Sequence, residues 1–153
     1  MIAHAGLVAA RIGGRWRGVL IEGPSGAGKS DLALRALSGG FRLVADDRTI
    51  LFVSAGRLFG RAPDALRGRI EVRGVGVMSV PPLPFAEVRL IVRCVESGAA
   101  LERLPDRRYH TVLDIEVPAI DLWPAEPSAV SKMSRALDWL GAFRQEAYQA
   151  AGT

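Results

Sequence analysis

The chain has 153 residues, 49% of them apolar, which suits one domain with a buried core and excludes intrinsic disorder. No stretch approaches the roughly 20 apolar residues of a membrane span, so we expect no membrane contact. The single cysteine, Cys94, cannot form an internal disulfide, which fits a reducing compartment, so we expect a cytoplasmic protein. The net charge is +4, but the arginines are scattered along the chain, so we expect no nucleic-acid binding.

The first part of the chain predicts strands around one helix. Two apolar segments, 6–12 and 17–23, are separated by a glycine-containing turn and read as two strands. Apolar residues at helical spacing predict a helix over 29–37, which two glycines would end. The next apolar segment, 41–47, predicts a short strand that finishes in two aspartates.

The middle of the chain predicts further short strands. Segment 49–60 reads as a hairpin, and 62–68 as a short helix or turn. Segment 70–80 is strand-like but is broken by Gly74 and Gly76.

Segment 86–95 is the clearest buried strand, and we expect Cys94 to be a buried strand residue rather than a nucleophile. The polar segment 101–110 predicts a loop. Segment 111–124 predicts extended structure, in which Pro118 favours an edge or a break.

Residues 128–150 predict a second helix with a core-facing or subunit-facing stripe. The stripe consists of Val130, Met133, Leu137, Leu140 and Phe143. Many short strands with two main helices indicate an α/β fold with a mixed sheet.

A phosphate-binding loop lies between the second strand and the first helix. The sequence "GPSGAGKS" matches G-x-x-x-x-G-K-[ST]. The predicted ligands of the nucleotide phosphates are Gly23, Pro24, Ser25, Gly26, Ala27, Gly28, Lys29 and Ser30. Lys29 should reach the β- and γ-phosphates, and the Ser30 hydroxyl should bind Mg²⁺. The motif indicates phosphate binding without naming the phosphoryl acceptor.

Two adjacent carboxylates end the strand after this loop. Asp46 is the natural support for the metal. Asp47 is then free to take a proton from an acceptor hydroxyl, although it could instead simply turn the chain. Farther along, Glu71 could complete the metal shell and Arg73 could hold a phosphate, or the two could form an ordinary exposed ion pair.

These pieces together resemble the catalytic domain of HPr kinase/phosphorylase, a bacterial protein-serine kinase family that phosphorylates the phosphocarrier protein HPr. The resemblance rests on "HAG" before the first strand, "GPSGAGKSD", "RLVADD" and "EVRGVGV". It implies a phosphate-loop domain similar to the nucleotide-binding part of phosphoenolpyruvate carboxykinase. It also implies ATP and Mg²⁺ as cofactors, HPr as partner, and a homo-oligomer, a hexamer in the family.

The resemblance also implies residue roles. His4 and Lys29 would be active-site residues, and Ser30 and Glu71 would be Mg²⁺ ligands. Asp47 would take the proton from the HPr serine and return one in the reverse reaction, with Asp46 supporting that step and the metal. Arg73 lies in the family's signature strand. Arg103 in "ERLPD" matches an arginine on a catalytic loop of the family.

The chain also departs from the family pattern. Longer members carry an additional N-terminal domain, so we expect a short form in which residues 1–153 are a single catalytic domain. The family's arginine-rich stretch tied to dephosphorylation is replaced by "PAEPSAVSKM", which leaves phosphorylase activity open. Two other functions stay open: a phosphate-loop kinase for small molecules, and a non-enzymatic nucleotide-dependent regulatory module.

Overall fold

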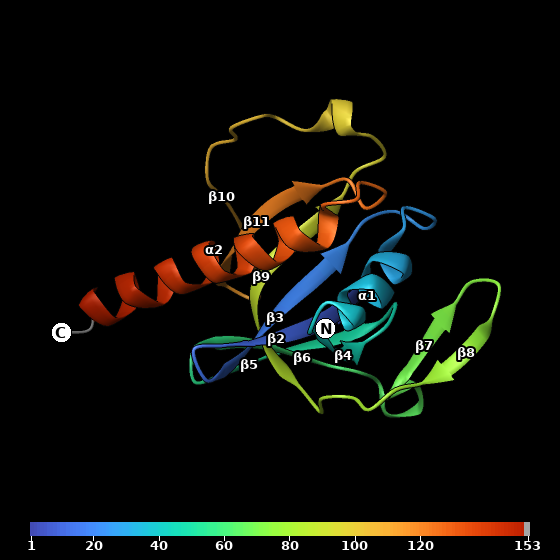
Figure 1. The fold of residues 1–153 in the computed structure, drawn as a ribbon. Helices are drawn as coiled ribbons and strands as arrows, with labels where there is room; N and C mark the ends of the chain where they lie inside the picture. The colour runs from blue at the N-terminus through green and yellow to red at the C-terminus, as the bar shows by residue number, and fades with distance from the viewer. Residues whose placement is uncertain (152–153) are drawn as a thin grey trace.

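A large mixed sheet, a separate two-stranded sheet and two main helices make up the structure, a computed structural model that describes the backbone of residues 1–151 and the side chains of residues 1–141 (Figure 1). The strands are β1 (Ile2–Ala3), β2 (Ala5–Ile12), β3 (Arg15–Glu22), β4 (Arg42–Ala45), β5 (Thr49–Ser54), β6 (Arg57–Arg61), β7 (Arg69–Val72), β8 (Gly76–Ser79), β9 (Ala86–Cys94), β10 (Arg108–Val112) and β11 (Ile115–Leu122). The helices are α1 (Lys29–Ser38) and α2 (Ala129–Ala151), with 3-10 turns η1 (Asp64–Leu66) and η2 (Gly98–Ala100).

The main sheet mixes parallel and antiparallel pairing, as predicted. Its strands run in the order β1-β5-β6-β9-β3-β2-β4, and β11 joins β9 with β10 beyond it. Strand β9 is parallel to both β3 and β11, whereas β2 pairs antiparallel with β3 and β4. The carboxyl ends of β3, β9 and β11 therefore meet at one edge of the sheet, where ligands commonly bind in α/β proteins.

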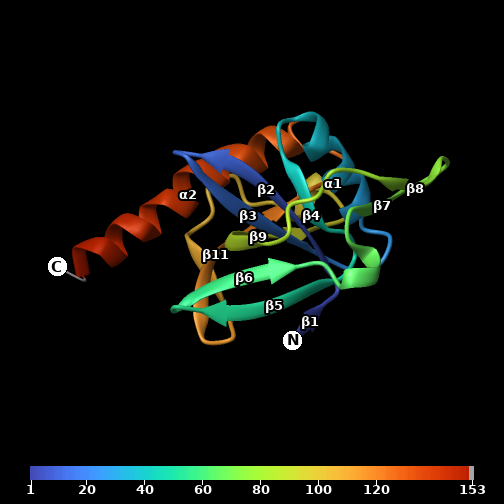
Figure 2. The same cartoon turned by 90° about the horizontal axis from the view of Figure 1, so that it is seen from below.

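Both faces of the sheet are buried. On one face, side chains such as Val19 and Ile21 pack with Leu32 of α1 and Met133 of α2. On the other face, the sheet curls so that β5 and β6 lie on the side away from the helices (Figure 2). Successive residues of β3 enter opposite clusters, because side chains alternate along a strand. The central strands are apolar on both sides for this reason.

The segment after the predicted helix-turn region forms a hairpin. Residues 70–80 break at the two glycines as expected, but the chain turns back there, with the N–H of Val75 bonded to the carbonyl of Val72. The resulting β7–β8 pair forms its own sheet. Only Ile70, 1% exposed, enters the main core from β7 as a fully buried side chain.

The polar segment 101–110 was expected to be a loop throughout, and this expectation is wrong for its end. Strand β10 begins at Arg108, because backbone pairing with β11 satisfies its polar groups whatever the side chains are. The expectation for Pro118 is confirmed. At this residue β11 pairs with β10, and its parallel pairing with β9 starts only at Ala119.

Helix α2 uses the predicted stripe. Met133 and Leu137 are fully buried, and Val130 and Leu140 pack against the same cluster. The side chain of Phe143 lies outside the described residues. Within the part of the chain that the structure describes, no helix has the length and apolar character needed to cross a bilayer.

Candidate functional site

The phosphate loop, residues 23–30, connects the carboxyl end of β3 to the start of α1. Gly26 and Gly28 have φ values of 80° and 96°, which residues with a Cβ rarely adopt. Gly23 lies against Cys94, and a Cβ on it would stand 3.0 Å from the Cys94 Cβ. The loop thus leaves its backbone N–H groups and the first turn of α1 available to an anion, at the positive end of the helix dipole.

Lys29 folds back over its own loop. Its Nζ donates a hydrogen bond of 2.6 Å to the carbonyl of Gly23. This bond holds the ammonium beside the loop, where bound phosphate oxygens would offer it a charged acceptor instead of a neutral one.

Asp46 connects three separate parts of the chain. Its Oδ1 accepts a 2.9 Å bond from the Ser30 hydroxyl, and its Oδ2 accepts a 3.0 Å bond from the backbone N–H of Glu71. One carboxylate at the end of β4 therefore fixes the start of α1 and the β7–β8 hairpin relative to each other. The same bond orients Ser30, whose proton is directed to Asp46 and whose lone pairs stay available to a cation.

Asp47 occupies an unusual backbone conformation. Its φ is 66°, and the N–H of Arg48 bonds to the carbonyl of Asp46 across it at 2.7 Å, as in a γ-turn. Positive φ at a residue with a side chain is strained, and aspartate and asparagine tolerate it best. Among the described residues, no group pairs with the exposed Asp47 carboxylate. The turn therefore presents an unpaired carboxylate at the site.

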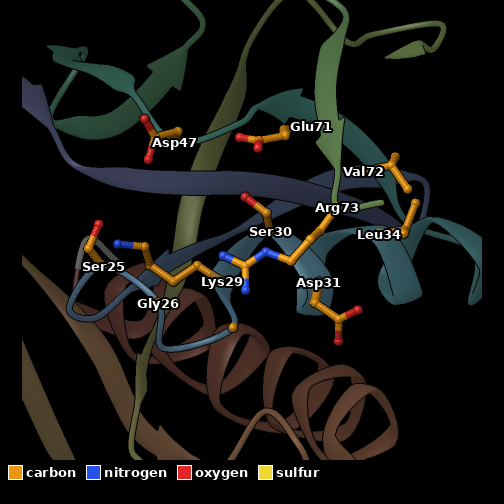
Figure 3. Close-up of a pocket in the computed structure, with 11 residues that line it drawn as sticks. Ser25, Gly26, Lys29, Ser30, Asp31, Leu34, Asp47, Glu71, Val72 and Arg73 are labelled. Atoms are coloured by element: carbon orange, nitrogen blue, oxygen red, sulfur yellow. The ribbon is translucent and has the colours of Figure 1, made fainter. Parts of the chain in front are cut away.

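These elements surround a cavity of about 420 Å³ (Figure 3). Its lining residues are Ser25, Gly26, Gly28, Lys29, Ser30, Asp31, Leu34, Asp47, Glu71, Val72 and Arg73. In the close-up, Asp47 and Glu71 stand on one side, opposite Lys29 and Ser30. The cavity thus combines phosphate-binding groups with carboxylates, an arrangement that can hold a nucleotide and accept a proton.

Eight of the fourteen predicted site residues line this cavity. Three others, Gly23, Pro24 and Ala27, belong to the loop itself, and Asp46 bonds to Ser30 and Glu71 from outside the lining. The remaining two, His4 and Arg103, lie apart from the cavity. His4 precedes Ala5, whose partner in the sheet is Glu22, so it lies at the same edge as the loop but does not line the cavity. Arg103 is exposed in the segment between η2 and β10, also outside the lining. The sequence reasoning missed three lining residues, Asp31, Leu34 and Val72. For Leu34 a sequence signal existed, because it lies one turn after Ser30 and therefore on the side of α1 that contacts β7.

A second, smaller cavity of about 250 Å³ lies on the other flank of the loop. It is formed where Trp123 and Pro124 pass close to the loop, and the Pro124 ring would be 3.3 Å from a Cβ on Gly28. Arg35 of α1 donates to the Pro124 carbonyl. This contact joins the last turn of α1 to the segment that passes behind the loop. Lys132 does not enter either cavity and pairs with Glu126 at 2.6 Å.

Cys94 is a buried strand residue, as expected. Burial raises the pKa of its thiol to about 11, although the nearby ammonium of Lys29 acts in the opposite direction. A thiol with this pKa is almost entirely neutral at pH 7, so Cys94 serves as packing behind the loop rather than as a nucleophile.

The oxygen groups beside the loop suit a hard cation. Ser30, Asp46 and Glu71 offer hydroxyl and carboxylate oxygens, which are the ligand types that Mg²⁺ prefers. Among the described residues, no three His, Cys, Asp or Glu side chains converge as a metal cage by themselves. This arrangement fits Mg²⁺, which usually keeps several waters and binds through one or two carboxylates together with substrate phosphates.

Comparisons with known proteins agree on one family. Residues 8–134 match the model described as HPr Serine kinase C-terminal domain. An HPr kinase/phosphorylase of Peptoclostridium acidaminophilum is 37% identical over 121 residues, which cover 72% of this chain and 39% of that protein. One from Xanthomonas campestris pv. campestris is 40% identical over 120 residues, covering 69% of this chain and 38% of that protein. The chain thus spans about two fifths of the length of these relatives.

The fold is also that of a solved structure. The HPr(Ser) kinase/phosphatase from Coxiella burnetii superposes with a TM-score of 0.77 at 27% identity, over 99% of this chain and 96% of that one. The match confirms the predicted α/β fold with a mixed sheet. With the phosphate loop and both aspartates inside the matched range, the chain belongs to the family of HPr serine kinase C-terminal domains.

Proposed function

We propose that this domain is a magnesium-dependent protein kinase that transfers the γ-phosphoryl group of ATP to a serine of an HPr-type phosphocarrier protein. One observation carries the proposal: Asp47 lines the same cavity as the phosphate loop, and its carboxylate has no partner among the described residues. A module that only binds nucleotide has no use for a proton acceptor at this place. The names of the relatives support HPr as the acceptor.

The loop and its neighbours would bind and neutralise the phosphates. The backbone N–H groups of residues 23–30 and the ammonium of Lys29 act at the β- and γ-phosphates. Arg73, exposed at the cavity wall, offers a planar guanidinium that can pair with phosphate oxygens. Ser30, Asp46 and Glu71 would hold Mg²⁺, which when bound supplies positive charge to the phosphate oxygens.

Asp47 would act on the acceptor. The serine oxygen forms a bond to the γ-phosphorus, the bond from that phosphorus to ADP breaks, and the serine proton passes to the Asp47 carboxylate. In the reverse direction the same carboxyl group would return the proton, so a phosphorylase activity would use the same residue. His4 and Arg103 are included as proposed active-site residues on the strength of the family resemblance.

The proposal extends to a cytoplasmic homo-oligomer, a hexamer by family resemblance, which light scattering of the purified protein tests. The function itself is tested by incubating the protein with HPr, ATP labelled on the γ-phosphate and Mg²⁺, and mapping the labelled residue. Label on one serine of HPr supports the proposal. Label on a sugar or nucleoside monophosphate instead identifies a small-molecule kinase, and ATP binding without turnover identifies a regulatory module.

A further inference from the structure

The β7–β8 hairpin exposes apolar side chains beside the candidate active site. Val75 is 73% exposed and Val77 is 69% exposed. In the hairpin register Glu71 pairs with Val77, and side chains of directly opposed residues lie on the same face. The face that carries Glu71 into the cavity therefore also carries Val77, and Val75 lies exposed in the turn beyond it.

The two valines do not serve the fold. The hairpin is fixed by Ile70 in the core, by the bond from the Glu71 N–H to Asp46, and by a 2.8 Å bond from the Val80 N–H to the Gly68 carbonyl. Neither exposed valine packs against either core cluster of the described residues. A neighbouring pair of large exposed apolar side chains on a projecting element marks an interaction surface more often than a packing need.

One arginine lies on the same strand as Glu71, and a second follows the strand. Arg69 precedes it by two residues and so shares its face, and Arg73 follows the strand at the cavity wall. Both are exposed, and within the described part of the chain neither has a carboxylate partner. The surface is thus apolar and positively charged, which complements a partner with apolar and acidic side chains.

This surface is continuous with the cavity. Glu71 and Arg73 line the same cavity as Asp47, and the hairpin projects from the body beside α1 (Figures 1 and 3). Because the hairpin borders this cavity, a macromolecule that brings a hydroxyl to Asp47 can also contact the two valines, whereas a small acceptor would leave both valines in water.

We propose that the valine face, defined as Arg69, Glu71, Arg73, Val75 and Val77, is the docking surface for the acceptor protein. Its occupant is a folded protein whose acceptor serine is flanked by apolar and acidic side chains. The inference rests on the proposed kinase function and adds to it the place where the acceptor binds.

The test is a double variant, Val75→Ser with Val77→Ser, which removes apolar surface without adding charge beside Glu71. The matched control is Val53→Ser, because Val53 is 43% exposed on β5, in a different hairpin. Both proteins should melt within about 2 °C of the wild type, since these are surface substitutions. With HPr as the acceptor, the double variant should raise the KM for HPr by about tenfold or more. Its kcat and its Kd for ATP should change by less than about twofold, and the control should change nothing.

Each outcome is decisive. An unchanged KM in the double variant overturns the proposal, and so does an equal rise in the Val53→Ser control. If KM is unchanged while light scattering shows a smaller assembly, the valine face contacts another copy of the chain instead. Failure of the kinase function is seen separately, because the wild type would then label no serine of HPr. As a second arm, Arg69→Gln should raise the KM more at low than at high ionic strength, because salt screens charge pairing.

Discussion

Replacing Asp46 with alanine should loosen the site by removing the two bonds that join the phosphate loop to the hairpin. Hydrogen bonds to a charged group contribute about 1.5–3 kcal/mol each. Two such bonds would sum to about 3–6 kcal/mol. Asp46 is half-buried, and water can replace it as the partner of Ser30 and Glu71, so the total loss should fall below this sum, to about 2 kcal/mol. For a domain of this size that corresponds to a fall in Tm of about 4–8 °C.

Urea denaturation measures this loss, with Asp64→Ala as the control. The Asp64 carboxylate is 97% exposed and 3.5 Å from Arg61, so its removal should change stability by less than about 0.5 kcal/mol. Asp46→Asn should unfold within about 1 kcal/mol of the wild type, because an amide can keep both contacts if the Ser30 hydroxyl reverses. If Asp46→Ala unfolds at the same urea concentration as the wild type, the bridge does not hold the site together.

Three further variants or conditions test separate parts of the account. Lys29→Ala should lower phosphoryl transfer by about 10²–10³-fold with the fold intact, because it removes charge from the transferring group; near wild-type turnover would exclude this loop. Glu71→Gln should raise the Mg²⁺ concentration for half-maximal activity and leave ATP binding without metal unchanged; an unchanged Mg²⁺ requirement would make Glu71 structural. At pH 8, Cys94 of the native protein should react with a thiol reagent at least about 100-fold more slowly than Cys94 of the protein unfolded in urea. The reason is that a pKa of about 11 leaves only about 0.1% of the thiol as thiolate at this pH.

The Cys94 measurement also has a predicted pH dependence. Its native pKa is raised from 9.0 to about 11, so the folded state disfavours the thiolate. The neutral Cys94 thiol therefore contributes to the free energy of unfolding in full below pH 9, and this contribution is lost as the pH rises from about 9 to about 11. Rapid labelling of native Cys94 at pH 8 would show that the segment behind the loop opens readily.

The local features of the site could be predicted because they depend on local sequence. Glycine spacing in residues 23–30 determines where the backbone can turn toward an anion, and the apolar run before Asp46 indicates a strand that ends there. The bridge made by Asp46 could not be predicted. It joins residues 16 and 25 positions away, and it depends on the register of β4 against β2, which contains an irregularity beside Leu7.

The hairpin shows a second limit of sequence reasoning. Gly74 and Gly76 indicate a break in either case, but glycine permits both an interrupted strand and a reversal of the chain. Only the burial of Ile70 and the pairing with β8 select the reversal. The roles of His4 and Arg103 come from the family resemblance alone. The place of His4 depends on how the chain enters the sheet, and Arg103 lies in an exposed segment. The periodicity of apolar residues predicts neither of these places.

The most direct test of the account is a paired measurement on Asp47→Asn. Asparagine tolerates the φ of 66° at this position, and no hydrogen bond to the carboxylate is lost among the described residues, so the fold and the loop should be preserved. The Kd for ATP should stay at the wild-type value, while serine phosphorylation of HPr should fall by about 10²–10⁴-fold, the range for a positioned base. Equal losses in ATP affinity and phosphorylation would contradict the account, because Asp47 would then hold the metal or the fold and the two aspartates would have exchanged roles.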